Sequence, residues 1–382
     1  MDFAFSTEQL AFRDRVAEFA RAELVDDVVP RDRDSQFSPE LWAKCADFGL
    51  LSLAAGSKYS RHDDVDFLTA LLAAEALGQH CPDNGLAFSV NAHVWTVQLP
   101  IVKFGTDEQK VRFLPPMCDG TMIGAHAITE PETGSDLYRM TTTAERVDGG
   151  YRLNGHKHYV SLAPIADIAL VFALTDPEAG KWGVTAFLVE ASAEGVTVGP
   201  NREKMGLRTV PFGDWTFENC FVPENQRLGP EGAGVSLSTS SLEWERCAIL
   251  ASQLGAMQRQ LDDCIAYARS RRQFDKPIGQ FQAVSHRIVE MKLRVETARL
   301  LLYKTGWLKQ SGKNAMTEAA LLKLHLAETF TASSLDAIRI HGARGYVSEF
   351  GIDRDARDAI GSTIYAGTSD IQRNIVARLL GL

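Results

Sequence analysis

The sequence contains no apolar run near ~18 residues, the length at which a segment is considered a membrane-spanning helix. Basic residues are not in excess either: the formal charge of −9 and the pI near 5.6 argue against a nucleic-acid-binding surface. The six cysteines occur without any CxxC pair, so neither a disulfide framework nor a metal site is expected. No GxGxxG follows a predicted strand, which leaves a Rossmann nicotinamide site without support.

The first residues, 1–5, lack the basic region and the apolar core of a signal peptide. Scattered, unpaired thiols are typical of a reducing compartment. We therefore expect a cytoplasmic protein. With 382 residues, 45% of them hydrophobic and 23% charged, the chain is long enough for two or three globular domains.

Two changes of pattern divide the chain into three predicted domains. Residues 1–120 predict an N-terminal α-helical domain, because capping-box spacing at residues 6–9 precedes apolar positions with helical periodicity. Pro115-Pro116 is expected to close it. Residues 121–232 predict a middle β-domain of short β-branched and aromatic runs. The expected strands cover residues 151–162, 167–174, 182–190, 196–198 and 215–222, with turns at 148–150 and 154–155.

Residues 233–382 predict a C-terminal bundle of long amphipathic helices, since apolar residues recur at steps of three and four. The third helix, residues 317–340, is expected to end at Gly342. A helical, then β, then helical order gives a mixed α+β class.

Two internal segments have the residue types of a phosphate or cofactor site. Residues 128–136 form a loop in which the hydroxyls of Thr129 and Ser135 can donate hydrogen bonds. Residues 269–278 end a helix with several guanidinium groups, which suit a pyrophosphate. Alone, each segment has a plainer explanation, a capped turn or favourable cations at a helix C-terminus.

Together with the closing residues 365–373, these segments resemble, in order and over the whole chain, the acyl-CoA dehydrogenase family of FAD enzymes. That family oxidises the α,β bond of acyl thioesters. The resemblance implies an α+β fold whose C-terminal domain is a four-helix bundle, and FAD shared between subunits of at least a dimer, usually a homotetramer. The residues implied to bind FAD are Thr129, Ser135, Tyr159, Ser161, Arg271, Gln273, Phe274, Arg339, Gly342, Thr368 and Asp370. Departures from the family pattern are Asp275, Arg339 and Ala343, where glycine, glutamine and glycine are usual.

The catalytic carboxylate is expected away from its commonest position. Many family members have a glutamate directly after the tyrosine of the closing motif, where this chain has Ala366. Glu245 is in register with the base of isovaleryl-CoA dehydrogenase and its relatives, so the resemblance implies that Glu245 removes the α-proton. The backbone N–H of Ala366 would still bind the thioester oxygen. The implied substrate contacts are Ser135, Glu243, Arg246 and Tyr365.

Several alternatives stay open at this point. The substrate is a short or branched acyl-CoA or, as in a biosynthetic subgroup that the chain also resembles, an aminoacyl group such as prolyl on a peptidyl carrier protein. After hydride transfer to flavin N5, electrons would pass to an electron-transferring flavoprotein or to oxygen. A flavin monooxygenase of the same fold, which needs no carboxylate base, and a non-catalytic flavoprotein are the other two possibilities.

Overall fold

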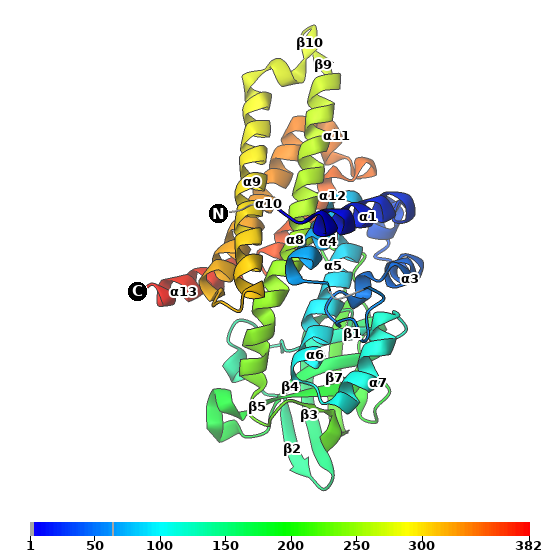
Figure 1. Cartoon of the computed structure of the whole chain (residues 1–382), viewed down its shortest axis with the longest axis vertical. Coiled ribbons are helices and arrows are strands. Elements are labelled where there is room, and N and C mark those ends of the chain that lie inside the picture. The colour runs from blue at the N-terminus through cyan, green and yellow to red at the C-terminus, as the bar shows by residue number, and fades with distance from the viewer. Residues whose placement is uncertain (1–3, 63–64) are drawn as a thin grey trace.

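The computed structural model describes residues 4–62 and 65–382. Of residues 1–5, which the sequence analysis compared with a signal peptide, residues 1–3 lie outside the described part. The N-terminal third is helical, as predicted (Figure 1). The capping box is present, with Ser6 and Gln9 each bonding the other's backbone. The helices are α1 (Thr7–Glu23), α2 (Val28–Arg33), α3 (Pro39–Phe48), α4 (Phe67–His80), α5 (Asn84–Ala92), α6 (Leu99–Phe104) and α7 (Asp107–Cys118).

The middle part is an eight-stranded sheet with strand order β6-β7-β3-β2-β4-β5-β8, and β1 pairs with β4 in parallel. The strands are β1 (Gly124–Ala127), β2 (Thr143–Val147), β3 (Gly150–Ser161), β4 (Ile168–Leu174), β5 (Val184–Glu190), β6 (Val196–Val198), β7 (Phe212–Pro223) and β8 (Arg227–Leu228). Alternate residues of β3 and β7 point into an apolar core that includes Tyr151, Leu153, Trp215 and Phe217.

The C-terminal part consists of three long helices and shorter ones that pack against them. They are α8 (Gly234–Ser270), α9 (Gln282–Gln310), α10 (Met316–His341), α11 (Ala343–Tyr346), α12 (Ile352–Ser362) and α13 (Ser369–Leu379). A two-stranded hairpin, β9 (Arg272–Gln273) and β10 (Lys276–Pro277), joins α8 to α9. In Figure 1, α8 runs from the β-domain to this hairpin at the opposite end of the molecule.

The two helical parts share one hydrophobic core, which α4 and α8 cross at its centre. Two glycines allow their backbones to touch: a Cβ on Gly78 would lie 1.8 Å from the carbonyl oxygen of Ser252, and one on Gly255 would lie 2.1 Å from that of Glu75. This crossing fixes α8, and with it the candidate base, against the N-terminal helices. Among the described residues, no helix is both long and apolar enough to cross a membrane.

Three local expectations were wrong. Pro115 and Pro116 lie inside α7 rather than after it. Each lacks the N–H that would donate to the carbonyl four residues earlier, and the helix ends two residues later, at Cys118. Residues 154–155 are not a turn but part of β3, where Gly155 avoids a clash with Thr142. Strands β1 and β2 were missed, and β1 contains small residues without the β-branched signature.

Candidate active site

Glu245 lies on α8 with its side chain almost wholly enclosed, at 8% exposure. Its carboxylate makes no hydrogen bond and no ion pair with the described part of the chain. Burial raises the pKa of Glu245 to about 7, against the opposing charge of Arg246. A carboxyl group with a pKa near the working pH, and with no partner, has the properties of a general base.

The next residue, Arg246, joins this turn of α8 to the closing loop. Its Nε donates to the carbonyl oxygen of Ala366 over 3.1 Å, and Gln372 Nε2 donates to that of Gly367 over 3.0 Å. Ala366 has a φ of 53°, in the left-handed region. Its N–H donates to no acceptor within the described residues, and it is therefore available to a ligand. Glu245 and the backbone N–H of Ala366, for which the sequence analysis expected catalytic roles, thus lie on adjoining segments.

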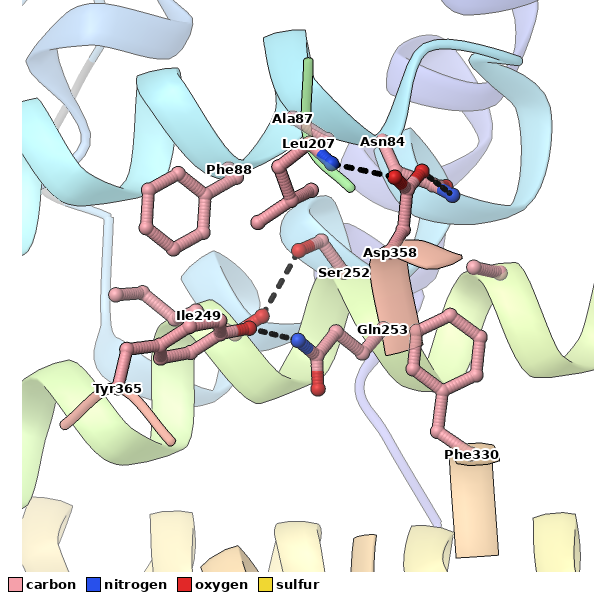
Figure 2. A pocket seen from close by; sticks show the side chains of 11 residues that line it. Asn84, Ala87, Phe88, Leu207, Ile249, Ser252, Gln253, Phe330, Asp358 and Tyr365 are labelled. Atoms are coloured by element: carbon pink, nitrogen blue, oxygen red, sulfur yellow. Dashed lines mark hydrogen bonds between the residues drawn. The ribbon is translucent and has the colours of Figure 1, made fainter. Parts of the chain in front are cut away.

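Tyr365, which precedes Ala366, lies among the side chains that line a small cavity (Figure 2). Its hydroxyl contacts the Gln253 amide, and its ring packs against Phe88 with centroids 5.1 Å apart. Burial is the main cause that raises the pKa of Tyr365, and the charges of Asp358 and Glu245 add to it, which places all three groups in one neighbourhood. A cavity of about 10 Å³, large enough for about one water molecule, lies beside Tyr365 and is lined by Phe88, Gln253, Asp358, Asn84, Leu207, Ile249 and Phe330 among others.

Asp358, Gln253 and Phe88 were not identified from the sequence. Asp358 accepts from the backbone N–H of Leu207 at 2.5 Å and from Asn84 Nδ2 at 3.0 Å (Figure 2). It thereby ties α12 to the loop before β7 and to α5. Burial raises the pKa of Asp358 to about 7, although these hydrogen bonds oppose it. Only the folded structure shows this role, because the three segments are far apart in the chain.

Glu243, which the sequence analysis placed among the substrate contacts, is occupied within the chain. Lys309 Nζ lies 2.5 Å from Glu243 Oε2, and both side chains are largely enclosed. Lys309 and Lys103 also face the ring of Trp244, at 5.0 Å and 4.0 Å from its centroid. Glu243 is therefore neutralised and poorly suited to act as the base.

The predicted cofactor loop is anchored by a buried ion pair. Glu130 accepts from Lys157 Nζ at 2.8 Å, from Thr141 N at 2.5 Å and from Thr142 N at 2.9 Å, and both charged side chains are almost completely enclosed. Burial disfavours the charged carboxylate, but Lys157 and the threonines hold the pKa of Glu130 below its usual range. Because Lys157 belongs to β3, the pair fixes the loop to the strand that contains Tyr159.

Several groups at this edge of the sheet lack partners within the chain. The hydroxyls of Thr129, Ser135 and Ser161 make no hydrogen bond with the described residues, and the Tyr159 ring is 55% exposed. A Cβ on Gly134 would meet open space. Free hydroxyl donors beside an exposed aromatic ring fit the pyrimidine edge, the phosphates and the flat ring of FAD.

The remaining predicted FAD residues lie elsewhere. Arg271, Gln273 and Phe274 lie at or in the β9–β10 hairpin, and Phe274 is 86% exposed. Glu245 and Arg271 are 26 positions apart, about 39 Å along α8 at ~1.5 Å per residue. The hairpin therefore lies far from Glu245 of the same chain.

Four further positions have identifiable local roles. Arg339 pairs with Asp336 at 3.2 Å near the end of α10, and Gly342, with φ 63° and ψ −134°, ends that helix in a backbone conformation that favours glycine. Thr368 caps α13, and Asp370 pairs with Arg373 at 3.0 Å.

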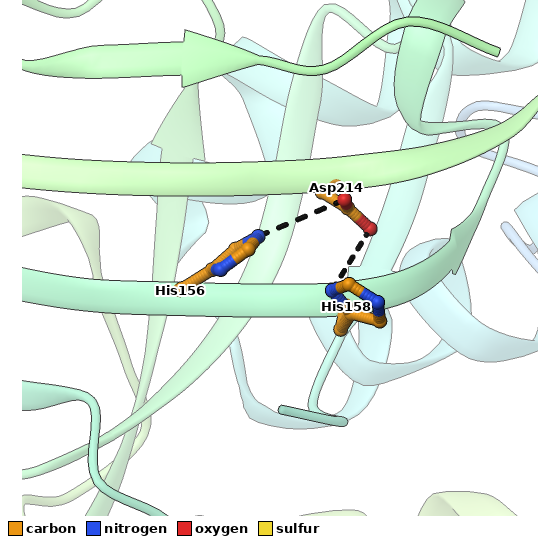
Figure 3. A group of neighbouring side chains, drawn as sticks. All are labelled: His156, His158 and Asp214. Carbon is orange, nitrogen blue, oxygen red and sulfur yellow. Dashed lines mark ion pairs between the residues drawn. The ribbon is translucent and has the colours of Figure 1, made fainter. Parts of the chain in front are cut away.

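His156, His158 and Asp214 lie close enough to suggest a metal site (Figure 3). However, Arg202 donates to both carboxylate oxygens of Asp214, with Nη2 at 2.5 Å from Oδ2 and Nε at 3.2 Å from Oδ1. A guanidinium in this position occupies the oxygens that a metal would need and adds a repelling charge.

This fold and site define an FAD-dependent oxidoreductase that dehydrogenates acyl thioesters, and the chain belongs to the acyl-CoA dehydrogenase family. The family's N-terminal domain matches residues 6–121, its middle domain residues 125–220 and its C-terminal domain residues 232–381. The expected fold class, cofactor and type of reaction are confirmed.

Among its relatives, the L-prolyl-[peptidyl-carrier protein] dehydrogenase of Pseudomonas fluorescens is 43% identical over the full length of both chains. The crystal structure of the prolyl acyl carrier protein oxidase AnaB has a TM-score of 0.97 and 43% identity, covering 99% of this chain and all of AnaB. The structure of PigA with FAD and proline also has a TM-score of 0.97, with 39% identity and full coverage of both chains.

Proposed function

We propose that this enzyme oxidises an aminoacyl group of prolyl type, held as a thioester on a peptidyl carrier protein, with Glu245 as the base. The similarity to the prolyl-specific proteins over the whole chain supports this substrate class. A short or branched acyl-CoA is the alternative that the experiment below distinguishes.

The observation that matters most is the unpaired, enclosed carboxylate of Glu245 beside the loop of Ala366. In the proposed reaction, Glu245 takes the proton from the carbon next to the thioester carbonyl. The Ala366 N–H donates to the thioester oxygen, where negative charge develops. FAD, when bound, supplies the acceptor for the hydride that leaves the β-carbon. Phe88, Tyr365 and Ile249 exclude water, which keeps Glu245 basic.

The residues that would hold FAD come from two subunits in this proposal. Thr129, Ser135, Tyr159 and Ser161 would contact it from one chain, together with Thr368 and Asp370. The exposed hairpin with Arg271, Gln273 and Phe274, and the nearby Arg339 and Gly342, would contact the cofactor of a neighbouring chain. The separation along α8 supports at least a dimer, and a homotetramer is the form we expect.

The electron acceptor and the location are part of the same proposal. AnaB is described as an oxidase, which favours oxygen, whereas an electron-transferring flavoprotein is the acceptor we would expect for a dehydrogenase. The six unpaired, buried cysteines are compatible with the cytoplasm.

The test compares substrates under anaerobic conditions. The purified enzyme is mixed with prolyl-loaded carrier protein or with short and branched acyl-CoAs, and bleaching of the flavin absorbance is followed by stopped flow. We expect bleaching with the prolyl carrier protein and little with the acyl-CoAs. Glu245→Gln should retain FAD but reduce the rate by roughly 10²- to 10⁴-fold, as expected for loss of a general base. Unchanged bleaching in that variant would refute the assignment of the base, and bleaching by acyl-CoA alone would refute the substrate.

A further inference from the structure

Strand β3 contains a bulge at the residue that faces the candidate cofactor site. Lys157 pairs with Trp215 and Val160 pairs with Gly213, so two residues, His158 and Tyr159, lie opposite the single residue Asp214. A bulge bends a strand and redirects its side chains. Here Tyr159 adopts a φ of 57°, and its ring turns outward to 55% exposure.

The side chain of Asp214 fills the position opposite the bulge. It accepts from the backbone N–H of Tyr159 at 3.3 Å, and Arg202 binds it through Nη2 at 2.5 Å (Figure 3 shows Asp214 with the two histidines). His158 Nδ1 lies 3.3 Å from Asp214 Oδ1. Burial works to raise the pKa of Asp214, but Arg202 and His158 together lower it, so the group is held as a carboxylate.

The ring of Tyr159 is supported by the same contacts. It lies nearly parallel to Phe212, at 16° with centroids 5.9 Å apart, and the Arg202 guanidinium lies 5.7 Å from its centroid. Thus the residue that holds Asp214 also contacts the ring. The left-handed backbone of Tyr159 is unfavourable for a bulky residue and persists only where its surroundings impose it.

We propose that Asp214, held by Arg202, is a positioning residue that fixes the Tyr159 bulge and so aims the tyrosine ring at the bound flavin. This inference rests on the proposed placement of FAD beside Tyr159, but not on the identity of the substrate or of the base. Asp214, within the three-residue cluster that resembles a metal site, then supports the cofactor through the hydrogen bond that it accepts from the Tyr159 N–H.

The experiment measures FAD retention by the holoenzyme upon dilution, from the fluorescence of released flavin, together with the visible circular dichroism of the bound flavin. Asp214→Ala should weaken FAD binding about tenfold, or about 1.4 kcal/mol, and alter the visible dichroism. Asp214→Asn should stay within about threefold of the wild type, because an amide oxygen still accepts the Tyr159 N–H. Glu218→Ala, which removes an exposed carboxylate from the same strand, is the matched control.

A double-mutant cycle separates positioning from general destabilisation. If Asp214 acts through Tyr159, adding Asp214→Ala to Tyr159→Ala should weaken FAD binding no further. Additive losses, or wild-type retention by Asp214→Ala, would overturn the proposal. The proposal would also be overturned if the purified protein contained a stoichiometric metal and EDTA released its FAD. None of these outcomes depends on turnover, so they remain informative even if the proposed substrate is wrong.

Discussion

The raised pKa of Glu245 predicts how the proton-transfer step depends on pH. The group must be ionised to accept a proton, and its folded pKa is about 7 rather than 4.5. The ionised fraction is then about one eleventh at pH 6 and about ten elevenths at pH 8, roughly a tenfold difference. The rate of anaerobic flavin bleaching at low substrate concentration should rise by about this factor between the two pH values.

The same shift has a consequence for stability. A carboxyl group whose pKa is raised by folding stabilises the folded state below its unfolded pKa of about 4.5, and this contribution is lost as the pH rises through about 7. Raising the pKa of Glu245 from 4.5 to about 7 corresponds to a contribution of roughly 3 kcal/mol to the unfolding free energy. Relative to the wild type, Glu245→Gln should therefore gain up to about 3 kcal/mol of unfolding free energy between pH 5 and pH 8.

Stopped-flow bleaching from pH 5.5 to 8.5 and urea unfolding at pH 5 and pH 8 measure the two effects. Glu243→Gln is the matched control, since Glu243 lies on the same helical turn but is paired with Lys309. It should leave the inflection near pH 7 in place. A bleaching rate that is flat across this range, or an inflection lost in Glu243→Gln and kept in Glu245→Gln, would refute the assignment.

Three further predictions concern the framework of the site. Lys157→Met should lower the unfolding free energy by about 3–5 kcal/mol, because it leaves Glu130 buried and unpaired. The control, Lys292→Met at the exposed pair with Glu296, should lower it by less than about 0.5 kcal/mol. Equal losses for the two variants in urea unfolding would contradict this prediction. Gly78→Ala should lower the melting temperature by several degrees, because its Cβ meets the Ser252 backbone, while Gly134→Ala should leave it almost unchanged. Ala366→Gly should raise the unfolding free energy by about 1 kcal/mol, since glycine adopts the left-handed conformation more easily; a loss would show that this φ is not strained.

The fold was largely predictable because its signals are local. The long amphipathic helices and the strands with β-branched runs appear close to the expected bounds, as β4 and β6 show. The turn at residues 154–155 was mistaken because a glycine that avoids Thr142 inside a strand has the same local sequence as a turn. The signal for β1 was absent, since its four residues contain two alanines and a glycine and depend on pairing with β4.

The candidate site was predictable only where a motif marks it. Glu245 and the closing loop follow from the order of motifs, but Asp358, Gln253 and Asp214 do not. Each of these acts through a partner far away in the chain: Asp358 through Asn84, Gln253 through Tyr365, and Asp214 through the bulge at Tyr159. Such contacts depend on the packing of elements and leave no periodic pattern in the sequence.

In many family members one residue, the glutamate that follows the tyrosine, supplies both the catalytic carboxylate and the backbone N–H that binds the thioester oxygen. In this chain, we propose that the two groups come from different segments. In this chain the carboxylate would come from α8, whose backbone is fixed by the crossing with α4, and the N–H from a loop. The hydrogen bond from Arg246 to the carbonyl oxygen of Ala366 holds these two segments together. Because Arg246 directly follows Glu245, this hydrogen bond links the helical turn of the proposed base to the loop of the proposed oxyanion donor, and the separation of the two groups depends on that side chain.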